Sequence, residues 1–339
     1  MYNTVSFPGF GIGEFTINPT AFKITDNITI EWYAIIICAG ILIAYFVCDR
    51  LAPRFSIKSD DLLDALLIGL PAGFIGARLW YILGDLDQFH SFMDVISVWN
   101  GGLAIYGGIF GGCLAAYFVC RFKKISFLNL IDLAAIGFMI GQIIGRWGNF
   151  ANVEVFGIQT DLPWRMGVGL NCIAEYVHPL FLYESLWNLV GLILILGYMD
   201  FRKYKGEIFL WYTAWYGIGR AWMEPLRDTS YNLHIFGVRI NMLLAIVAAV
   251  VAIGCIILLH LRKPEKLMTG AGRALKNVPE SDYEAQFSYA AEAADIPEEP
   301  ESEEAEDIAE DLPEAGEEQK AERGPDTDPE SKKETEERE

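Results

Sequence analysis

The chain has 339 residues, with 45 acidic against 26 basic side chains and a formal net charge of −19, yet 53% of its residues are apolar. Such a charged composition and a mean hydropathy of +0.26 do not coexist in one ordinary globular domain, so the charge must be segregated. Residues 279–339 hold 25 acidic and 5 basic side chains, which leaves 20 acidic and 21 basic for residues 1–278. A nearly neutral, apolar body excludes a nucleic-acid-binding surface, and the acidity belongs to a tail.

The six cysteines show no C-x-x-C spacing, and all but Cys172 lie in apolar runs. They are typical of small core residues rather than of a disulfide framework or a metal site. We therefore expect no metal and no other cofactor.

Residues 1–29 lack the basic start and apolar core of a signal peptide, so we expect an external N-terminal segment that is followed by a membrane domain over 30–262. Apolar stretches of membrane-spanning length follow one another through this domain. They predict an all-α integral membrane protein with seven transmembrane helices, over 30–48, 62–83, 101–120, 127–144, 179–198, 208–223 and 240–261.

The basic residues predict the orientation of these helices. Fourteen of them follow the odd-numbered spans, whereas the other side holds only Lys23, Arg165, Arg227 and Arg239. Because positive residues stay inside, the N-terminus should be outside and the C-terminus cytoplasmic. Residues 263–339 should form a cytoplasmic juxtamembrane segment and a disordered acidic tail, either purely solvated or able to recruit partners.

Three arginines remain after this assignment: Arg78, Arg146 and Arg220. Each lies in or at the outer end of an even-numbered span, where an unpaired guanidinium is costly and therefore indicates a functional site. The structural alternative is an arginine that reaches the interface or pairs with a nearby carboxylate.

Arg146 lies in the run GRWGNFANVEVFG at 145–157. If the fourth helix continues to Asn149, these two side chains share one face, and Asn152 and Glu154 follow just beyond it. Amide and carboxylate groups around one guanidinium suit a phosphate, which arginine binds through two parallel hydrogen bonds.

Arg220, Glu224 and Arg227 form a second group at helical spacing near the outer end of the sixth span. Pro225 should kink or end the helix there. Glu224 could neutralise either arginine, so a structural ion-pair ladder is the alternative to an anionic headgroup site.

Six glycines within 101–112 surround Tyr106. Such a stretch mostly indicates close helix packing in a bilayer. The Tyr106 hydroxyl would nevertheless be accessible to a molecule that binds close to the backbone.

These motifs resemble the bacterial prolipoprotein diacylglyceryl transferase family. The run at 145–157 is similar to the family signature, and the resemblance covers about 28–262. Shorter matches follow in the same order along the chain, at 31–33, 76–78, the turn around Tyr106, His178 with Pro179, Tyr183 with Glu184, and 216–220 with Glu224 and Arg227. Several ordered motifs form a far stronger signal than one short pattern.

The resemblance implies transfer of the diacylglyceryl group of phosphatidylglycerol to the lipobox cysteine of prolipoprotein signal peptides. A thioether would form and glycerol phosphate would leave. The enzyme would lie among membrane lipids in the bacterial cytoplasmic membrane, with its site toward the external leaflet.

The resemblance also suggests roles for single residues. Arg146 is expected to bind the phosphate, with Asn149, Asn152 and Gly157 shaping the site and Glu154 orienting the arginine. Arg220, held by Glu224, is expected to stabilise the leaving phosphate. Tyr33 and Arg78 are further candidates for binding phosphatidylglycerol.

Two positions depart from the family pattern. Tyr106 stands where the family often has a histidine that has been considered as a base, and Asn241 stands near a polar position that is commonly glutamine. A neutral tyrosine is a poor base, so Glu154, Glu224 and His178 remain candidate proton acceptors beside Tyr106.

Two other classes of protein remain open from the residues alone. Buried arginines also line the pathways of transporters and flippases, although no inverted repeat is evident here. A membrane scaffold would explain the acidic tail, but not the arginines within the spans.

Overall fold

The computed structural model describes residues 3–25, 28–86, 89–97, 101–228, 234–235 and 238–262. The predicted juxtamembrane segment and acidic tail at 263–339 lie outside these ranges, as do Trp99 and Asn100 of the glycine-rich stretch.

Within the described ranges, six helices are long and apolar enough to cross a membrane, which confirms a multi-pass helical protein. The predicted sixth span, 208–223, forms α7 (Glu207–Met223), which is not among these six helices. It has only 17 residues and carries a charge near each end. A short α3 (Phe92–Ile96) precedes α4. The six longer helices are α1 (Trp32–Leu51), α2 (Ser59–Gly84), α4 (Ile105–Lys123), α5 (Phe127–Ala151), α6 (Leu180–Tyr198) and α8 (Ile240–Leu261).

The helix ends follow local signals in the sequence. The Ser126 hydroxyl accepts a hydrogen bond from the backbone of Asn129 and caps the start of α5. At the other end, α5 continues past Asn149 to Ala151, beyond the predicted span of 127–144, so the condition for Arg146 and Asn149 to share one face is met. Helix α7 ends at Met223, and a 3-10 turn with Pro225 follows, which confirms the predicted helix end.

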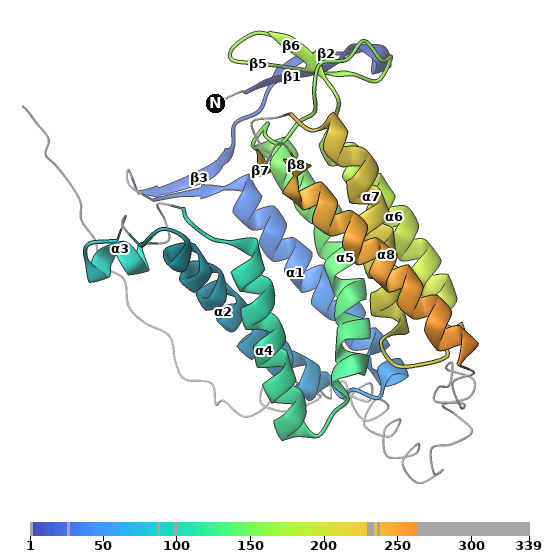
Figure 1. Cartoon of the computed structure of the whole chain (residues 1–339). Helices are drawn as coiled ribbons and strands as arrows, with labels where there is room; N and C mark the ends of the chain where they lie inside the picture. Colours follow the sequence, from blue (N-terminus) through green and yellow to red (C-terminus); the bar gives the residue numbers. More distant parts are fainter. Residues whose placement is uncertain are drawn as a thin grey trace, which may run out of the picture. The chain divides into compact units, whose positions relative to one another are not determined.

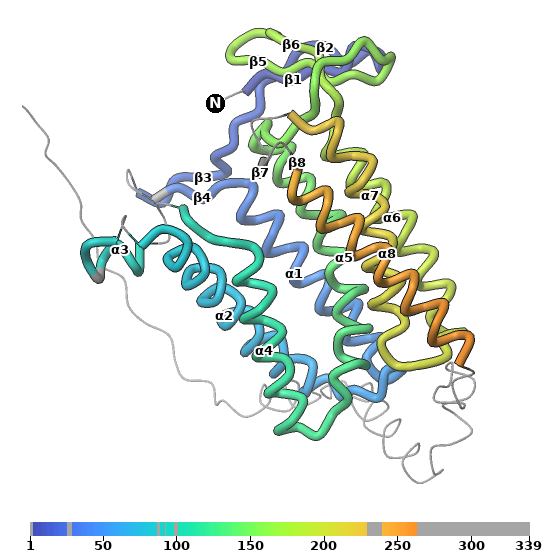
Figure 2. Tube along the Cα trace, viewed as in Figure 1, coloured from blue at the N-terminus to red at the C-terminus, as the bar shows by residue number. Residues whose placement is uncertain are grey.

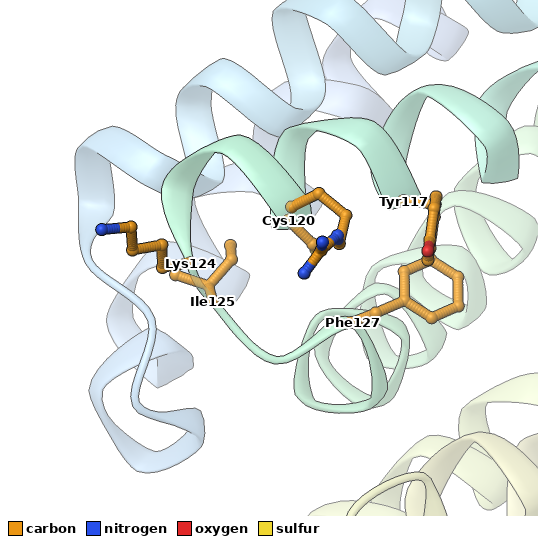
Figure 3. Close-up of a pocket in the computed structure, with 6 residues that line it drawn as sticks. Tyr117, Cys120, Lys124, Ile125 and Phe127 are labelled. Atoms are coloured by element: carbon orange, nitrogen blue, oxygen red, sulfur yellow. The ribbon is translucent and has the colours of Figure 1, made fainter.

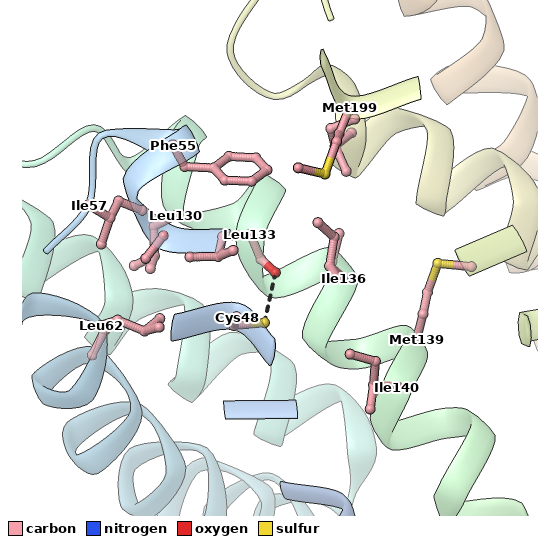
Figure 4. Packing of buried hydrophobic residues seen from close by; sticks show 14 of the residues in the cluster. Cys48, Phe55, Ile57, Leu62, Leu130, Leu133, Ile136, Met139, Ile140 and Met199 are labelled. Carbon is pink, nitrogen blue, oxygen red and sulfur yellow. Dashed lines mark hydrogen bonds between the residues drawn. The ribbon is translucent and has the colours of Figure 1, made fainter. Parts of the chain in front are cut away.

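Helix α5 is the centre of the bundle, with α1 on one side and α6 and α7 on the other (Figure 1). Its largest buried residues are Leu133, Ile136 and Met139. They pack against the end of α1 and the turn after α6, where Phe55 and Met199 close the core (Figure 4).

Helices α2 and α4 form a close pair, visible side by side in Figure 2. A Cβ atom on Gly76 would lie 2.4 Å from the carbonyl oxygen of Gly107, and one on Gly107 would lie 2.3 Å from that of Gly76. Bare backbones therefore make this contact, which confirms the packing role expected for the glycine-rich stretch.

We expect Gly76→Ala to lower the thermal unfolding temperature in detergent by several degrees, because overpacking costs about 1–3 kcal/mol. Gly69→Ala on the same helix is the matched control, since nothing lies within 4 Å of its added methyl group. Equal unfolding temperatures of the two variants would show that α2 and α4 separate at no cost.

Buried polar contacts join α5, α7 and α8 at the end of the bundle where α5 begins. The carboxylate of Asp132 accepts hydrogen bonds from the backbone nitrogens of Gly206 (2.8 Å) and Phe209 (2.9 Å) and so caps α7. Glu207 accepts a hydrogen bond from the hydroxyl of Tyr198 and lies 3.5 Å from His260. These bonds offset the cost of burying the two carboxylates.

Short strands flank the helices at the opposite end, beyond what the all-α prediction foresaw. Each has at most six residues, too few for its alternation to stand out in the sequence. An antiparallel sheet has the order β2-β1-β5-β6, from Ile12–Thr16, Thr4–Phe7, Met166–Gly169 and Glu175–Val177. Two hairpins pair β3 (Thr20–Thr25) with β4 (Ile28–Glu31) and β7 (His234–Ile235) with β8 (Val238–Arg239).

A second apolar cluster fixes the sheet to the helices. Val5, Val168 and Val177 are almost fully buried under the sheet, where they pack with Phe156 and with Phe181 of α6. This cluster connects the loop after α5 to the start of α6, and these two segments carry much of the site described below.

Candidate active site

The last turns of α5 place Arg146 and Asn149 on one face. Nη1 of Arg146 donates a hydrogen bond to Oδ1 of Asn149 at 3.2 Å, across the three residues that bring the two side chains to the same face. The Arg146 side chain keeps 23% of its surface exposed, the most of any arginine in the cluster described here.

Glu184 of α6 is the centre of the cluster. Its two carboxylate oxygens face three guanidinium groups, with Arg146 Nη2 at 2.6 Å, Arg227 Nη2 at 2.7 Å and Arg220 Nη1 at 3.6 Å. The residue is only 5% exposed. A buried carboxylate needs cationic partners, and the three arginines from α5, α7 and the turn after α7 supply them.

Glu224 is the second carboxylate of the cluster and is 1% exposed. Its Oε2 lies 3.0 Å from Nε of Arg220 and 3.9 Å from Nε of Arg227, so the closer of its two ion pairs is with Arg220. Its backbone carbonyl accepts a hydrogen bond of 2.6 Å from Nη1 of Arg239, at the start of α8. The ends of α7 and α8 are thereby joined at the site.

Glu154 reaches Arg146 through Asn149, a connection compatible with the expected orienting role. Its Oε1 accepts hydrogen bonds from the side-chain amides of Asn149 (3.0 Å) and Asn152 (3.3 Å), and Asn149 in turn holds Arg146. Val153 (φ 49°) and Val155 (φ 57°) flank it in left-handed conformations that β-branched residues rarely adopt. Such strain persists only where the surroundings fix the backbone, and it is typical of functional sites.

Gly157 joins three segments of the chain around the site. Its backbone nitrogen donates to the carbonyl of His178 at 3.0 Å, and it forms a bridge with Arg227. A Cβ atom here would lie 2.6 Å from Cβ of His178 and 2.7 Å from the carbonyl of Leu226. A side chain at this position would therefore displace His178 or Leu226, the residue before Arg227.

His178 lies at the entrance to α6, with Nδ1 at 3.3 Å from the hydroxyl of Tyr183. Burial lowers the pKa of His178 and so favours its neutral ring. The hydroxyl of Tyr183 also accepts a hydrogen bond from Nε1 of Trp164 at 2.6 Å.

The remaining predicted site residues lie in different surroundings. The ring of Tyr33 packs on Gly148, two residues after Arg146 on α5, since a Cβ there would lie 2.8 Å from the ring. The hydroxyl of Tyr106 donates a hydrogen bond to Oδ1 of Asn241 at 3.1 Å, so the two positions that depart from the family pattern contact each other.

Arg78 has a structural environment that does not favour the expected lipid contact. Its guanidinium donates five hydrogen bonds within the described part of the chain, all to backbone carbonyls, and an arginine has five N–H donors. The acceptors lie in the segment between α2 and α4: Asp94, Val95, Ser97, Gly101 and Gly102. The geometry therefore assigns Arg78 to holding this connection in place.

The sequence reasoning missed the role of Glu184. The predicted topology leaves three basic residues unassigned to either membrane face, which makes them site candidates. The acidic residues within the spans were not considered in the same way. A carboxylate five residues into an apolar span, at the outer end where the arginines gather, was the available signal.

Together, the membrane-length helices and the cluster define a class of protein. Three guanidinium groups, those of Arg146, Arg220 and Arg227, converge on the carboxylates of Glu184 and Glu224 at one end of the bundle, and Arg146 is the most exposed of the three. This is a multi-pass membrane protein with a largely buried cluster of arginines and carboxylates.

Comparison with known proteins identifies the family. The sequence model of the prolipoprotein diacylglyceryl transferase family matches residues 19–258. A relative from Lactobacillus delbrueckii subsp. bulgaricus is 38% identical over 270 residues, which cover 76% of this chain and 96% of the relative. One from Lysinibacillus sphaericus is 40% identical over 252 residues, covering 71% and 92%. Both are named phosphatidylglycerol–prolipoprotein diacylglyceryl transferase. The chain belongs to the prolipoprotein diacylglyceryl transferase family and is a transferase.

Proposed function

We propose that this chain transfers the diacylglyceryl group of phosphatidylglycerol to the lipobox cysteine of prolipoproteins, the first step of lipoprotein maturation, and that the arginine cluster holds the phosphate. The convergence of three guanidinium groups at one end of the bundle carries this assignment. Arg146, the most exposed of the three, can bind a phosphate through two parallel hydrogen bonds.

Arg146 binds the phosphate of phosphatidylglycerol, because it is the most exposed arginine of the cluster. Asn149, Asn152 and Glu154 hold it through the chain of hydrogen bonds described above. Gly157 keeps the signature loop against the segment of Arg227, and Tyr33 bounds the site on the α1 side.

The chemical step is a displacement at a glycerol carbon. The cysteine sulfur, as a thiolate, forms a C–S bond while the bond from the same carbon to the phosphate oxygen breaks, and that oxygen keeps the electron pair. Arg220, oriented by Glu224, stabilises the charge on the departing glycerol phosphate. The thiol proton goes to a basic group, for which His178, Glu154 and Glu224 are candidates beside Tyr106.

The contact of Tyr106 with Asn241 makes a positioning role for its hydroxyl the better supported one. We expect Tyr106→Phe to lower kcat/KM roughly twofold to tenfold, because a net hydrogen bond contributes about 0.5–1.5 kcal/mol. Tyr117→Phe, on the same helix, is the control. Complete loss of activity with an unchanged unfolding temperature would instead assign Tyr106 to the chemical step.

The seven-span topology, with the N-terminus and the site outside and the tail cytoplasmic, is part of this proposal. It rests on the basic residues that follow the odd-numbered spans. Cys172, exposed in the connection between β5 and β6, should react with a membrane-impermeant maleimide added to intact cells. Cys172→Ser should abolish that labelling. Labelling of Cys172 only after lysis would place this connection inside the cell and so indicate the opposite topology.

The decisive assay for the reaction uses the purified full chain, labelled phosphatidylglycerol and a lipobox peptide. A transferase yields a lipidated peptide and one glycerol phosphate for each peptide modified. Movement of the lipid between leaflets without a modified peptide would point to a transporter. No effect on either substrate would be the result for a scaffold.

A further inference from the structure

A second basic feature lies at the end of α5 far from the arginine cluster. Helix α5 begins at Phe127 and reaches Arg146 after nineteen residues, a rise of about 28 Å at 1.5 Å per residue. The hydrocarbon core of a bilayer is about 30 Å thick. The two ends of α5 therefore lie near opposite membrane surfaces.

A hollow of about 360 Å³ opens where α4 turns into α5. Figure 3 shows Lys124 on one side and the rings of Tyr117 and Phe127 together on the other, with centroids 6.0 Å apart. The lining residues are Tyr117, Cys120, Arg121, Lys124, Ile125 and Phe127.

The cations of this hollow differ from their neighbours in how they are paired. Lys123, between them in sequence, forms ion pairs with Asp61 (3.5 Å) and Asp64 of α2. Among the described residues, neither Arg121 nor Lys124 has a carboxylate within ion-pair distance. The carboxylates of α2 thus neutralise Lys123, whereas Arg121 and Lys124, which line the hollow, form no ion pair with a described residue.

Two further features favour an anion here. The hollow includes Phe127, the first residue of α5, so the positive end of a 25-residue helix lies beside it. The Tyr117 and Phe127 rings supply an amphipathic wall of the kind found at headgroup depth. A cationic hollow with such a wall suits a phosphate that is attached to a lipid.

Apolar side chains continue from the hollow along α4 toward the membrane interior. Phe118 and Leu114 precede Arg121 by three and seven residues, on the same helical face, and are 50% and 45% exposed. They offer a surface for acyl chains directly below the cations. A free phosphate ion has no acyl chains, so contact with this apolar surface would not increase its affinity.

We propose that the hollow formed by Arg121, Lys124, Tyr117 and Phe127 binds the phosphate headgroup of an anionic phospholipid in the leaflet opposite to the arginine cluster. The site is separate from the transferase reaction and does not depend on it. Its lipid would anchor the turn between α4 and α5 at the membrane surface.

The test is native mass spectrometry of the purified full chain titrated with phosphatidylserine or with phosphatidylcholine. Arg121→Gln/Lys124→Gln should weaken phosphatidylserine binding about thirtyfold, or about 2 kcal/mol, because each cation near an anionic surface contributes about 1 kcal/mol. Phosphatidylcholine binding should stay unchanged. The matched control is Arg50→Gln/Lys58→Gln, which removes two exposed cations elsewhere on the chain.

Each outcome decides the proposal. Equal phosphatidylserine affinity of the wild-type chain and the Arg121→Gln/Lys124→Gln variant, or an equal loss in the control, would overturn it. Competition by inorganic phosphate as strong as that by phosphatidylserine would replace the lipid with a free anion and also overturn it. Repeating the titration in Arg146→Ala separates this site from the cluster, because the thirtyfold effect should persist there. Unchanged transferase activity of the Arg121→Gln/Lys124→Gln variant in detergent would show that it is folded.

Discussion

Glu184→Gln is expected to lower kcat/KM by about 10²-fold, because a misplacement of about 1 Å among positioned catalytic groups can cost that much. Removing one partner of a buried ion pair also lowers the free energy of unfolding, by about 3–5 kcal/mol. The carboxylate meets Arg146, Arg220 and Arg227 within a space that is almost closed to solvent. Glutamine has nearly the same shape, but it carries no charge and would direct amide protons at a guanidinium. The three arginines would then repel one another and lose their common orientation.

The measurement is kcat/KM together with the thermal unfolding temperature in detergent. Glu175→Gln is the control, because Glu175 is a half-exposed carboxylate at the same end of the molecule. A positioning role predicts that the folded Glu184→Gln variant has a higher KM for phosphatidylglycerol. Wild-type activity and stability of Glu184→Gln would remove this residue from the site.

The second large effect is expected from Arg146 and Arg220, whose removal should change different kinetic parameters. Arg146→Ala should mainly raise KM for phosphatidylglycerol, because this side chain is the more exposed and meets the phosphate on binding. Arg220→Ala should mainly lower kcat, by about 10²–10³-fold, the usual cost of losing one donor that stabilises charge in the transition state.

Steady-state kinetics with varied phosphatidylglycerol and a saturating lipobox peptide separates the two parameters. Lysine at either position should restore only part of the loss, because an ammonium group lacks the planar pair of donors of arginine. An unchanged kcat in Arg220→Ala would mean that another group stabilises the leaving phosphate.

The parts of the site that the sequence predicted depend on local geometry. Helical spacing places Asn149 three residues after Arg146 and Glu224 four residues after Arg220, and the structure has both contacts. Pro225 ends α7 because it lacks the backbone donor. Such features are set by residues within one or two turns of each other.

The parts that it did not predict depend on contacts between distant segments. Glu184 meets Arg146 from 38 positions away and Arg227 from 43, and no periodicity encodes such a meeting. Arg78 resembled a functional arginine because the sequence indicates its depth in the membrane. The backbone carbonyls that accept its hydrogen bonds can be identified only in the structure. The bond between Tyr106 and Asn241 spans 135 positions and was equally hidden.

The most direct test of the arginine cluster as the place where the phosphate is held and released is a single-turnover measurement of glycerol phosphate release. It compares the wild-type chain, Arg146→Ala/Arg220→Ala and the control Arg165→Ala, whose arginine lies over Tyr176 at the same end of the molecule. We predict release that depends on the peptide in the wild type and in Arg165→Ala, and none above background in the double variant. Near-normal release by the folded double variant would contradict the assignment.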